Sequence, residues 1–235
     1  VQTCALPISK MILRDVRSGQ KLDVAGLNEL TVLIDRSETE LTEVAMNSWS
    51  PGLDGPPHFH ERKEQMFLVT AGRGKVRIGT VDFATEPGAL FYVPAGLLHQ
   101  TINLQPTARL DYFLFNAFVD ADKEGHASFA DHIAKVKETR RRQALAQDAL
   151  ADAESVPAAS ARVGRRILLR DQPGPRTIML DRAEAARCEA VYLACGPGDR
   201  LPDHTDDSKE QTLFVLEGAG RVSIGAELAE VSAGQ

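Results

Sequence analysis

Short runs that alternate apolar and polar residues, or that are rich in β-branched residues, dominate the first half of the chain. Runs of this length, separated by Gly, Pro and Asp, are typical of antiparallel strands. The strands predicted in this way cover residues 31–34, 41–47, 65–70, 75–80, 89–93 and 109–115.

The residues between these runs favour tight turns. Gly72 and Gly74 flank Arg73, and Gly88 follows Glu86-Pro87. Glycine adopts positive φ without steric cost, so such positions suit the sharp reversals between strands. Many short strands joined by tight turns predict an all-β fold built from antiparallel β-barrel or double-sheet jelly-roll modules.

The pattern changes after residue 128 to one that predicts a helix. Residues 128–149 lack strand alternation, and Ser128 followed by Asp131 is a signal for a helix start. Phe129, Ile133 and Val136 form one apolar stripe at helical spacing. Residues 148–161 are rich in Ala and Ser and are interpreted as a linker.

An internal repeat indicates that the chain contains two copies of one module. Shifting the sequence by 146 positions aligns residues 31–36 with 177–182, and 63–65 with 209–211, without a gap. A match over so long a stretch is the signature of a duplicated unit. We therefore predict a first module at residues 11–120, a helix and linker at 121–165, and a second module at 166–235.

Both ends of the chain carry an expectation of their own. Residues 1–10 precede Met11 and are expected to be a non-native leader. The repeat aligns Gly88 with Gly234, so the second module is expected to be truncated before the segment that follows Gly88 in the first.

Three histidines and one glutamine form the most specific chemical pattern in the chain. His58 and His60 are two residues apart, so on an extended segment both imidazoles face the same side. Gln65 opens the next apolar run, and His99 follows a Pro-Ala-Gly turn, so folding must bring these two to the pair. We interpret His58, His60, Gln65 and His99 as the ligands of one metal ion.

The segments around these residues resemble the paired signature motifs of the cupin superfamily. In the second motif Gly88, Pro94, Gly96, His99 and Asn103 occupy every fixed position. The first motif departs once, because Gln65 stands where the family usually has a glutamate. The resemblance implies a bicupin whose first module holds a divalent transition metal: Fe(II), Mn(II), Ni(II) or Zn(II).

Position 65 also leaves one alternative open, since Glu64 precedes it. Neighbours on a strand face opposite sides, so Glu64 would become a ligand only if the strand register shifted by one residue. With Gln65 as the ligand, a neutral amide leaves the charge of the ion uncompensated, which favours an anionic ligand or substrate.

The second module retains only part of this pattern. His204 and Gln211 align with His58 and Gln65, whereas Asp206 replaces His60. We expect the first module alone to bind metal tightly.

Composition narrows the classes of partner. The formal charge is −6, with 33 acidic and 27 basic residues, which argues against a nucleic-acid partner. No apolar run approaches the length of a membrane span, and no signal peptide is evident, so a cytoplasmic location is expected. Cys188 and Cys195 are interpreted as small apolar residues rather than a disulfide. The predicted partner is a small, anionic molecule, and a homo-oligomer remains open.

Open positions on the ion would allow chemistry. We expect a metal-dependent oxygenase that acts on a small anionic or aromatic substrate. The alternatives are a metal-dependent isomerase or lyase acting on a sugar acid, and a non-catalytic ligand-binding or sensor module. The sequence assigns no catalytic residue. Candidates that could face the cavity are Glu43, Tyr92, Asp111 and Tyr112, with Phe67, Phe91 and Phe113 as apolar lining or, alternatively, core packing.

Overall fold

The computed structural model describes residues 11–145, 163–172, 174–205 and 209–235, without the side chains of residues 140–145. These residues form mostly β structure, together with one α-helix and two short 3-10 turns. The elements are β1 (Gln20–Val24), β2 (Asn28–Ile34), β3 (Thr42–Trp49), β4 (Lys63–Ala71), β5 (Gly74–Ile78), β6 (Val81–Thr85), β7 (Ala89–Val93), β8 (His99–Ile102), β9 (Leu110–Phe118), η1 (Lys123–Gly125), α1 (Phe129–Leu145), β10 (Arg165–Leu168), η2 (Leu169–Asp171), β11 (Arg176–Leu180), β12 (Ala190–Leu193), β13 (Ala219–Ile224) and β14 (Glu227–Ser232).

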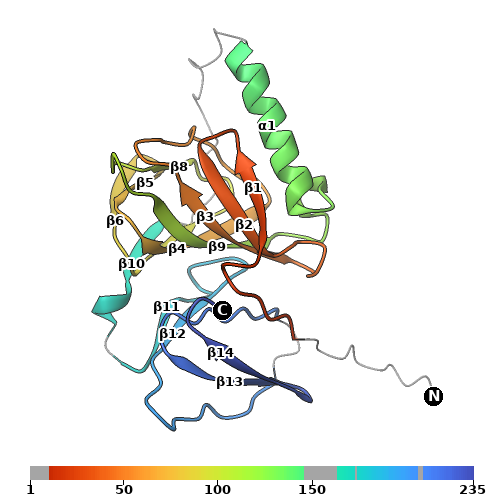
Figure 1. Ribbon diagram of the computed structural model, residues 1–235, viewed down its shortest axis with the longest axis vertical. Helices are drawn as coiled ribbons and strands as arrows, with labels where there is room; N and C mark the ends of the chain where they lie inside the picture. The colour runs from red at the N-terminus through yellow and green to blue at the C-terminus, as the bar shows by residue number, and fades with distance from the viewer. Residues whose placement is uncertain (1–10, 146–162, 173, 206–208) are drawn as a thin grey trace, which may run out of the picture.

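Two antiparallel sheets enclose a core in the N-terminal part of the chain, β1 to β9 together with β10 (Figure 1). One sheet has the strand order β1-β2-β3-β9-β4-β7-β10, and the other has the order β6-β5-β8. Inward-facing side chains from both sheets form one apolar cluster, which includes Phe67, Phe91 and Leu110 from the first sheet and Val76 from the second. The predicted all-β, double-sheet architecture is therefore confirmed.

All six predicted strands are present and overlap β2, β3, β4, β5, β7 and β9, although the predicted ranges extend one or two residues past one end of β3, β5 and β9. The alternation does not predict β1, β6 or β8. β1 and β6 have five residues each and expose most of them, so the alternation in each covers only two apolar positions. β8 has four residues and begins at His99, which makes it too short to show a period.

The predicted helix is also present, at α1. Ser128 accepts a hydrogen bond from the backbone N–H of Asp131 at 3.1 Å, which satisfies one free donor of the first turn. Phe129 and Ile133 are buried in the core cluster. α1 lies alongside β1 (Figure 1). The last part of the predicted helix, residues 146–149, and the predicted linker at 148–161 lie outside the described residues.

The sequence repeat has counterparts in the backbone of the C-terminal segment, by which we mean the described residues from 163 to 235. β13 and β14 form a hairpin 146 positions after the hairpin of β5 and β6. The glycines of the two turns have nearly equal angles, with φ of 59° at Gly79 and 60° at Gly225. The glycines before the hairpins also correspond, with φ of 85° at Gly72 and 82° at Gly218.

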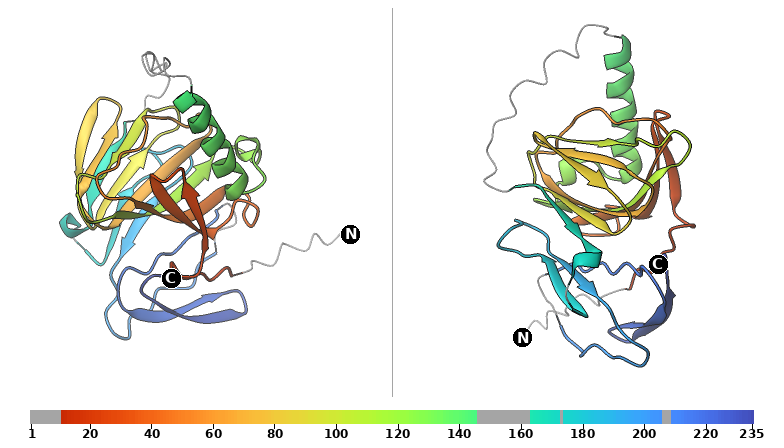
Figure 2. Two further views of the ribbon diagram at one scale, coloured as in Figure 1. Left: turned by 45° about the horizontal axis from the view of Figure 1, so that its top comes forward. Right: turned by 90° about the vertical axis from the view of Figure 1, so that its left-hand side faces the viewer.

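The C-terminal segment packs on the outer face of the seven-stranded sheet (Figure 2). Met66 and Tyr92 on that face form a second apolar cluster with Leu180 and Cys188. β10 extends the same sheet by pairing with β7. The outer face is therefore covered, so apolar residues occur on both faces of the central strands.

Two glutamates make reciprocal contacts between the segments. Glu64 accepts hydrogen bonds from the backbone N–H groups of Ala186 and Arg187, both at 2.9 Å. Glu210 accepts from those of Glu40 and Leu41, at 2.6 and 2.8 Å. Each participant lies 146 positions from its counterpart. The same residue position thus serves both sides, as in an interface with two-fold symmetry.

Candidate metal site

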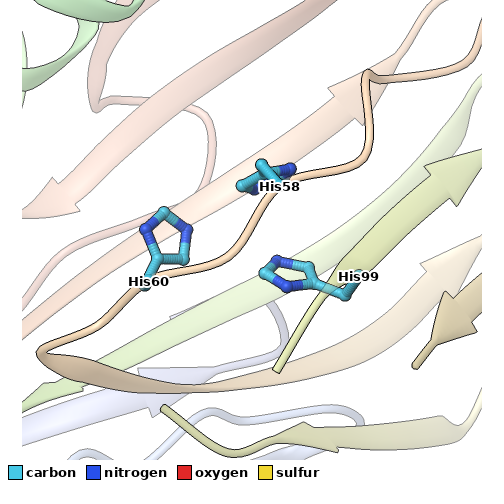
Figure 3. Close-up of side chains that lie close together, drawn as sticks. All are labelled: His58, His60 and His99. Atoms are coloured by element: carbon cyan, nitrogen blue, oxygen red, sulfur yellow. The ribbon is translucent and has the colours of Figure 1, made fainter. Parts of the chain in front are cut away.

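Three histidines from two segments lie close together (Figure 3). His58 and His60 lie in the extended segment between β3 and β4, and His99 begins β8. One ring nitrogen of each lies within 4.8 Å of the others. The ring centroids are 4.3 Å apart for His58 and His99, and 5.1 Å apart for His58 and His60.

Backbone hydrogen bonds hold the two segments together. The N–H of His58 donates to the carbonyl of His99 at 3.0 Å, and that of His99 donates back at 2.8 Å. The N–H of Gly96, which has φ of 80°, donates to the carbonyl of His60 at 2.7 Å. A glycine suits this turn because other residues rarely adopt such an angle. The histidine separation is therefore set by the main chain.

Two of the rings are oriented by their own neighbours. Nδ1 of His58 lies 3.1 Å from the carbonyl oxygen of Pro56, and Nδ1 of His99 lies 3.1 Å from that of Leu97. A carbonyl only accepts, so each Nδ1 carries the proton and each Nε2 keeps a lone pair. Carbonyl contacts of this kind are a usual support for histidine metal ligands.

Burial holds the pKa values of the His60 and His99 rings well below their ordinary range, and the positive charge of Lys63 lowers the pKa of His60 further. These two rings are therefore neutral. Neutral imidazole is the form that coordinates metals. Nε2 of His99 is buried and has no hydrogen-bond partner among the described residues. A divalent transition metal would satisfy that atom, so the donor set fits such an ion.

In the metal-free protein, we expect the free energy of unfolding to fall as the pH is lowered through about 6.5. Unfolded histidines take up protons there, whereas folded His60, His99 and His132 stay neutral; burial lowers the pKa of His132 to about 2. Each contributes at most about 1.4 kcal/mol of lost stability per pH unit. Urea unfolding between about pH 7.5 and about pH 5.5 measures this slope.

Two variants separate the buried rings from an exposed one. His132→Gln should reduce the slope by up to about 1.4 kcal/mol per pH unit, since one group no longer takes up a proton on unfolding. His204→Gln, at an exposed position, is the matched control. Equal slopes in the unaltered protein and in both variants would contradict the expectation.

Gln65 and Glu64 face opposite sides of β4. Gln65 lies on the inner face with Phe67, whose ring centroid is 6.0 Å from that of His99. Oε1 of Gln65 is buried without a hydrogen-bond partner among the described residues. Glu64 instead binds the C-terminal segment on the outer face. The alternative of Glu64 as a ligand thus finds no support, whereas Gln65 as the fourth ligand stays a prediction.

The four candidates for a cavity-facing base take different positions. Tyr92 lies on the outer face, where its hydroxyl donates to Glu64 at 2.8 Å. Asp111 also lies on that face and accepts a hydrogen bond from Ser48. Glu43 faces inward but is fully buried in an ion pair with Arg36. Tyr112 faces the core, where its hydroxyl accepts from Asn47 and Trp49 at 2.8 and 3.0 Å.

The three aromatic candidates for the cavity lining also lie in different surroundings. Phe67 lies next to His99 and packs 5.0 Å from the ring of Tyr112. Phe91 is fully buried and packs on Phe83 in the core, 6.3 Å between centroids. Phe113 faces outward and stacks on Phe214 of the C-terminal segment at 4.3 Å. Of the two readings given for Phe113, packing against other apolar residues is the one that this contact agrees with, because the outer face of the sheet has an apolar partner.

Several residues near the histidines are not predicted from the sequence. His132 on α1 lies 6.3 Å from His60 and 5.2 Å from His126, between ring centroids. Glu124, in the η1 turn, places a carboxylate oxygen 3.7 Å from Nδ1 of His60 and another 3.2 Å from Nζ of Lys63. His132 falls at i+3 from Phe129, within the apolar stripe, and that spacing is a usable signal.

The C-terminal segment does not reproduce this cluster within its described part. His204 repeats the local contact of His58, with Nδ1 3.3 Å from the carbonyl of Pro202, but the residue is exposed. Gln211 is exposed as well, and Asp206 lies outside the described residues. Among the residues that the structure describes, His58, His60 and His99 form the one group of three potential ligand side chains.

A separate finding concerns membranes. None of the helices in the described part of the chain combines the length and the apolar composition needed to cross a bilayer.

Known proteins resemble the chain over part of its length. Residues 47–113 match the family model described as Cupin domain, a range that includes all four candidate ligands. No curated protein sequence matches the chain.

Solved structures also resemble it. KdgF from Halomonas sp. is 22% identical with a TM-score of 0.41, and the match covers 46% of this chain and 94% of that one. A protein described as a predicted oxalate decarboxylase from Thermotoga maritima is 14% identical with a TM-score of 0.42, covering 45% and 98%. Vicilin from tomato, Solanum lycopersicum, is 19% identical with a TM-score of 0.42, covering 48% and 34%. The family-model match lies within the segment that carries the three clustered histidines.

Proposed function

We propose that the first module binds a divalent transition metal through His58, His60, His99 and Gln65. The observation that carries the proposal is the convergence of three histidine nitrogens within 4.8 Å of one another. The orphaned Nε2 of His99 and Oε1 of Gln65 add two buried acceptors that need a partner. Bound there, an Fe(II) or Mn(II) ion would supply redox and Lewis-acid chemistry.

The protein would use this site as an oxygenase acting on a small anionic or aromatic substrate. Three imidazoles and one amide are neutral donors, so the charge of the ion favours an anionic partner. A shallow pocket that is largely open to solvent lies beside the η1 turn and is lined by residues that include Arg36, Lys123 and His126. Phe67 would limit the access of water to the ion, and no catalytic base is assigned.

We also propose that residues 166–235 are part of a second copy of the same module, which makes the chain a bicupin. The matching turn glycines and hairpins support this reading. So do the reciprocal contacts of Glu64 and Glu210.

Metal analysis and oxygen uptake test the proposed activity. Mass spectrometry of the purified protein is expected to find about one transition metal per chain. Protein reconstituted with Fe(II) or Mn(II) should consume oxygen with a member of a panel of small carboxylates and phenols. The matched control is the His58→Ala, His60→Ala double variant, which should neither hold metal nor consume oxygen.

The other outcomes identify the alternatives. Turnover of uronates without oxygen, by protein loaded with Ni(II) or Zn(II), would replace the oxygenase with a metal-dependent isomerase or lyase. Metal and ligand binding without turnover in either assay would replace it with a non-catalytic binding module. Absence of metal under all loading conditions would overturn the site itself.

A further inference from the structure

A chain of buried hydrogen bonds begins at Arg36 and ends at Gln65. Nε of Arg36 donates to one carboxylate oxygen of Glu43 at 2.7 Å, and Nη2 donates to the other at 3.1 Å. Both side chains have no exposed surface. A guanidinium has no acceptor atom, so the direction of these bonds is fixed: Glu43 accepts.

Asn116 continues the chain in the same direction. It is the direct cross-strand partner of Glu43 on β3 and of Gln65 on β4, so the three residues form one row across adjacent strands. Nδ2 of Asn116 donates to Glu43 Oε1 at 2.7 Å. The side-chain oxygen Oδ1 of Asn116 therefore faces Gln65, and it accepts a hydrogen bond from Gln65 Nε2 at 2.9 Å.

The orientation of the Gln65 amide follows from this order. With Nε2 bound to Asn116, the other end of the amide is Oε1, which is buried without a partner. A carboxylate at position 65 would instead place an oxygen against the Asn116 carbonyl with no proton between them. If the asparagine turned over to correct this, its carbonyl would face Glu43. The row thus favours an amide, and one orientation of it.

We propose that Arg36, Glu43 and Asn116 are positioning residues that hold Gln65 with Oε1 toward the metal. The inference rests on the proposed metal site, because it assigns the orphaned Oε1 to the ion. A glutamine free to rotate would present its N–H₂ group to the ion for part of the time, and that group is not a ligand. Supporting residues of this kind typically change metal affinity by about 10- to 100-fold.

We call the hydrogen-bonded series Arg36, Glu43, Asn116 and Gln65 the relay. Replacement of Asn116 tests it, and replacement of a second buried asparagine outside the series is the matched control. Asn116→Leu should lower the affinity for Mn(II) and Co(II) by about 10- to 100-fold in a chelator competition. The control is Asn47→Leu on the inner face of β3, where Asn47 is buried and binds Asn28 and Tyr112 instead. That variant should keep the affinity within about threefold. The visible absorption of bound Co(II), which reports the ligand set, should change in Asn116→Leu only.

The results separate the relay from the site. Failure of the unaltered protein to bind either metal overturns the proposed function and the relay with it. Binding by Asn116→Leu with unaltered affinity and spectrum overturns the relay alone, as does an equal loss in both variants. If Asn116→Leu does not fold, side-chain amide signals of the unaltered, metal-free protein decide. Slow exchange of the Gln65 Nε2 protons is expected, and exchange as fast as that of exposed glutamines overturns the relay.

Discussion

Replacing His99 with alanine is expected to lower the affinity for a divalent transition metal by at least about a hundredfold. His99 is the most buried of the three histidines, and its Nε2 has no other partner among the described residues. Its backbone also pairs with His58 in both directions, and this pairing should survive the substitution. Metal content by mass spectrometry and a chelator competition measure the loss.

The matched control for His99→Ala is His204→Ala. His204 sits at the repeat position of His58 and makes the same contact with a carbonyl two residues earlier, but it is exposed. Its removal should leave metal content unchanged. Equal metal content in the unaltered protein and in His99→Ala would rule out the histidine cluster as the site.

Replacing Glu64 with alanine is expected to lower the free energy of unfolding by about 3 kcal/mol. The buried carboxylate accepts hydrogen bonds from the backbone N–H groups of Ala186 and Arg187 and from the hydroxyl of Tyr92. The fully buried Tyr92 hydroxyl would lose the acceptor that it has in this contact. Urea unfolding, followed by the fluorescence of the single tryptophan, Trp49, measures the change.

Glu210→Ala is the internal control for this contact. Glu210 makes the equivalent pair of bonds to Glu40 and Leu41, but it is exposed, so water can replace the carboxylate. Its loss should cost no more than about 1 kcal/mol. A Glu64 variant as stable as the Glu210 variant would show that the buried carboxylate contributes no more than an exposed one.

Local features of the fold were predictable because they depend on neighbouring residues. The alternation of apolar and polar residues predicted six strands. Ser128 as a helix-start signal, with Phe129 and Ile133 at helical spacing, predicted the helix. The two-residue spacing of His58 and His60 fixes the direction of both side chains on an extended segment, whereas the place of His99 beside them was expected from the resemblance to the cupin motifs.

The face of the sheet on which a strand residue lies was harder to predict from the sequence. Residues 89–93 and 112–115 are apolar at successive positions, because the C-terminal segment covers the outer face of their sheet. In such a strand the pattern of apolar residues does not show which side chains face the core and which face the C-terminal segment. Tyr92 and Phe113 fall on the outer face for this reason, whereas Tyr112 falls inside.

The supporting residues of the site could not be derived from spacing. Asn116 reaches Gln65 across a strand pairing that joins positions 51 residues apart. Glu124 reaches His60 from a turn in which Lys123 and Glu124 have positive φ of 48° and 62°. Residues other than glycine and asparagine rarely adopt such angles, so no sequence rule anticipates that turn.

Glu64 and Gln65 make hydrogen bonds on opposite faces of β4, and these contacts help to fix the register of β4 with the neighbouring strands. A slip of one residue would turn Gln65 outward, away from Asn116, and would turn Glu64 into the apolar core. Both hydrogen-bonded contacts would be lost together, and a carboxylate would be buried without its donors. Two adjacent polar residues with partners on opposite faces therefore make the slipped sheet a costly misfolded state, and they protect the strand pairing as the chain folds.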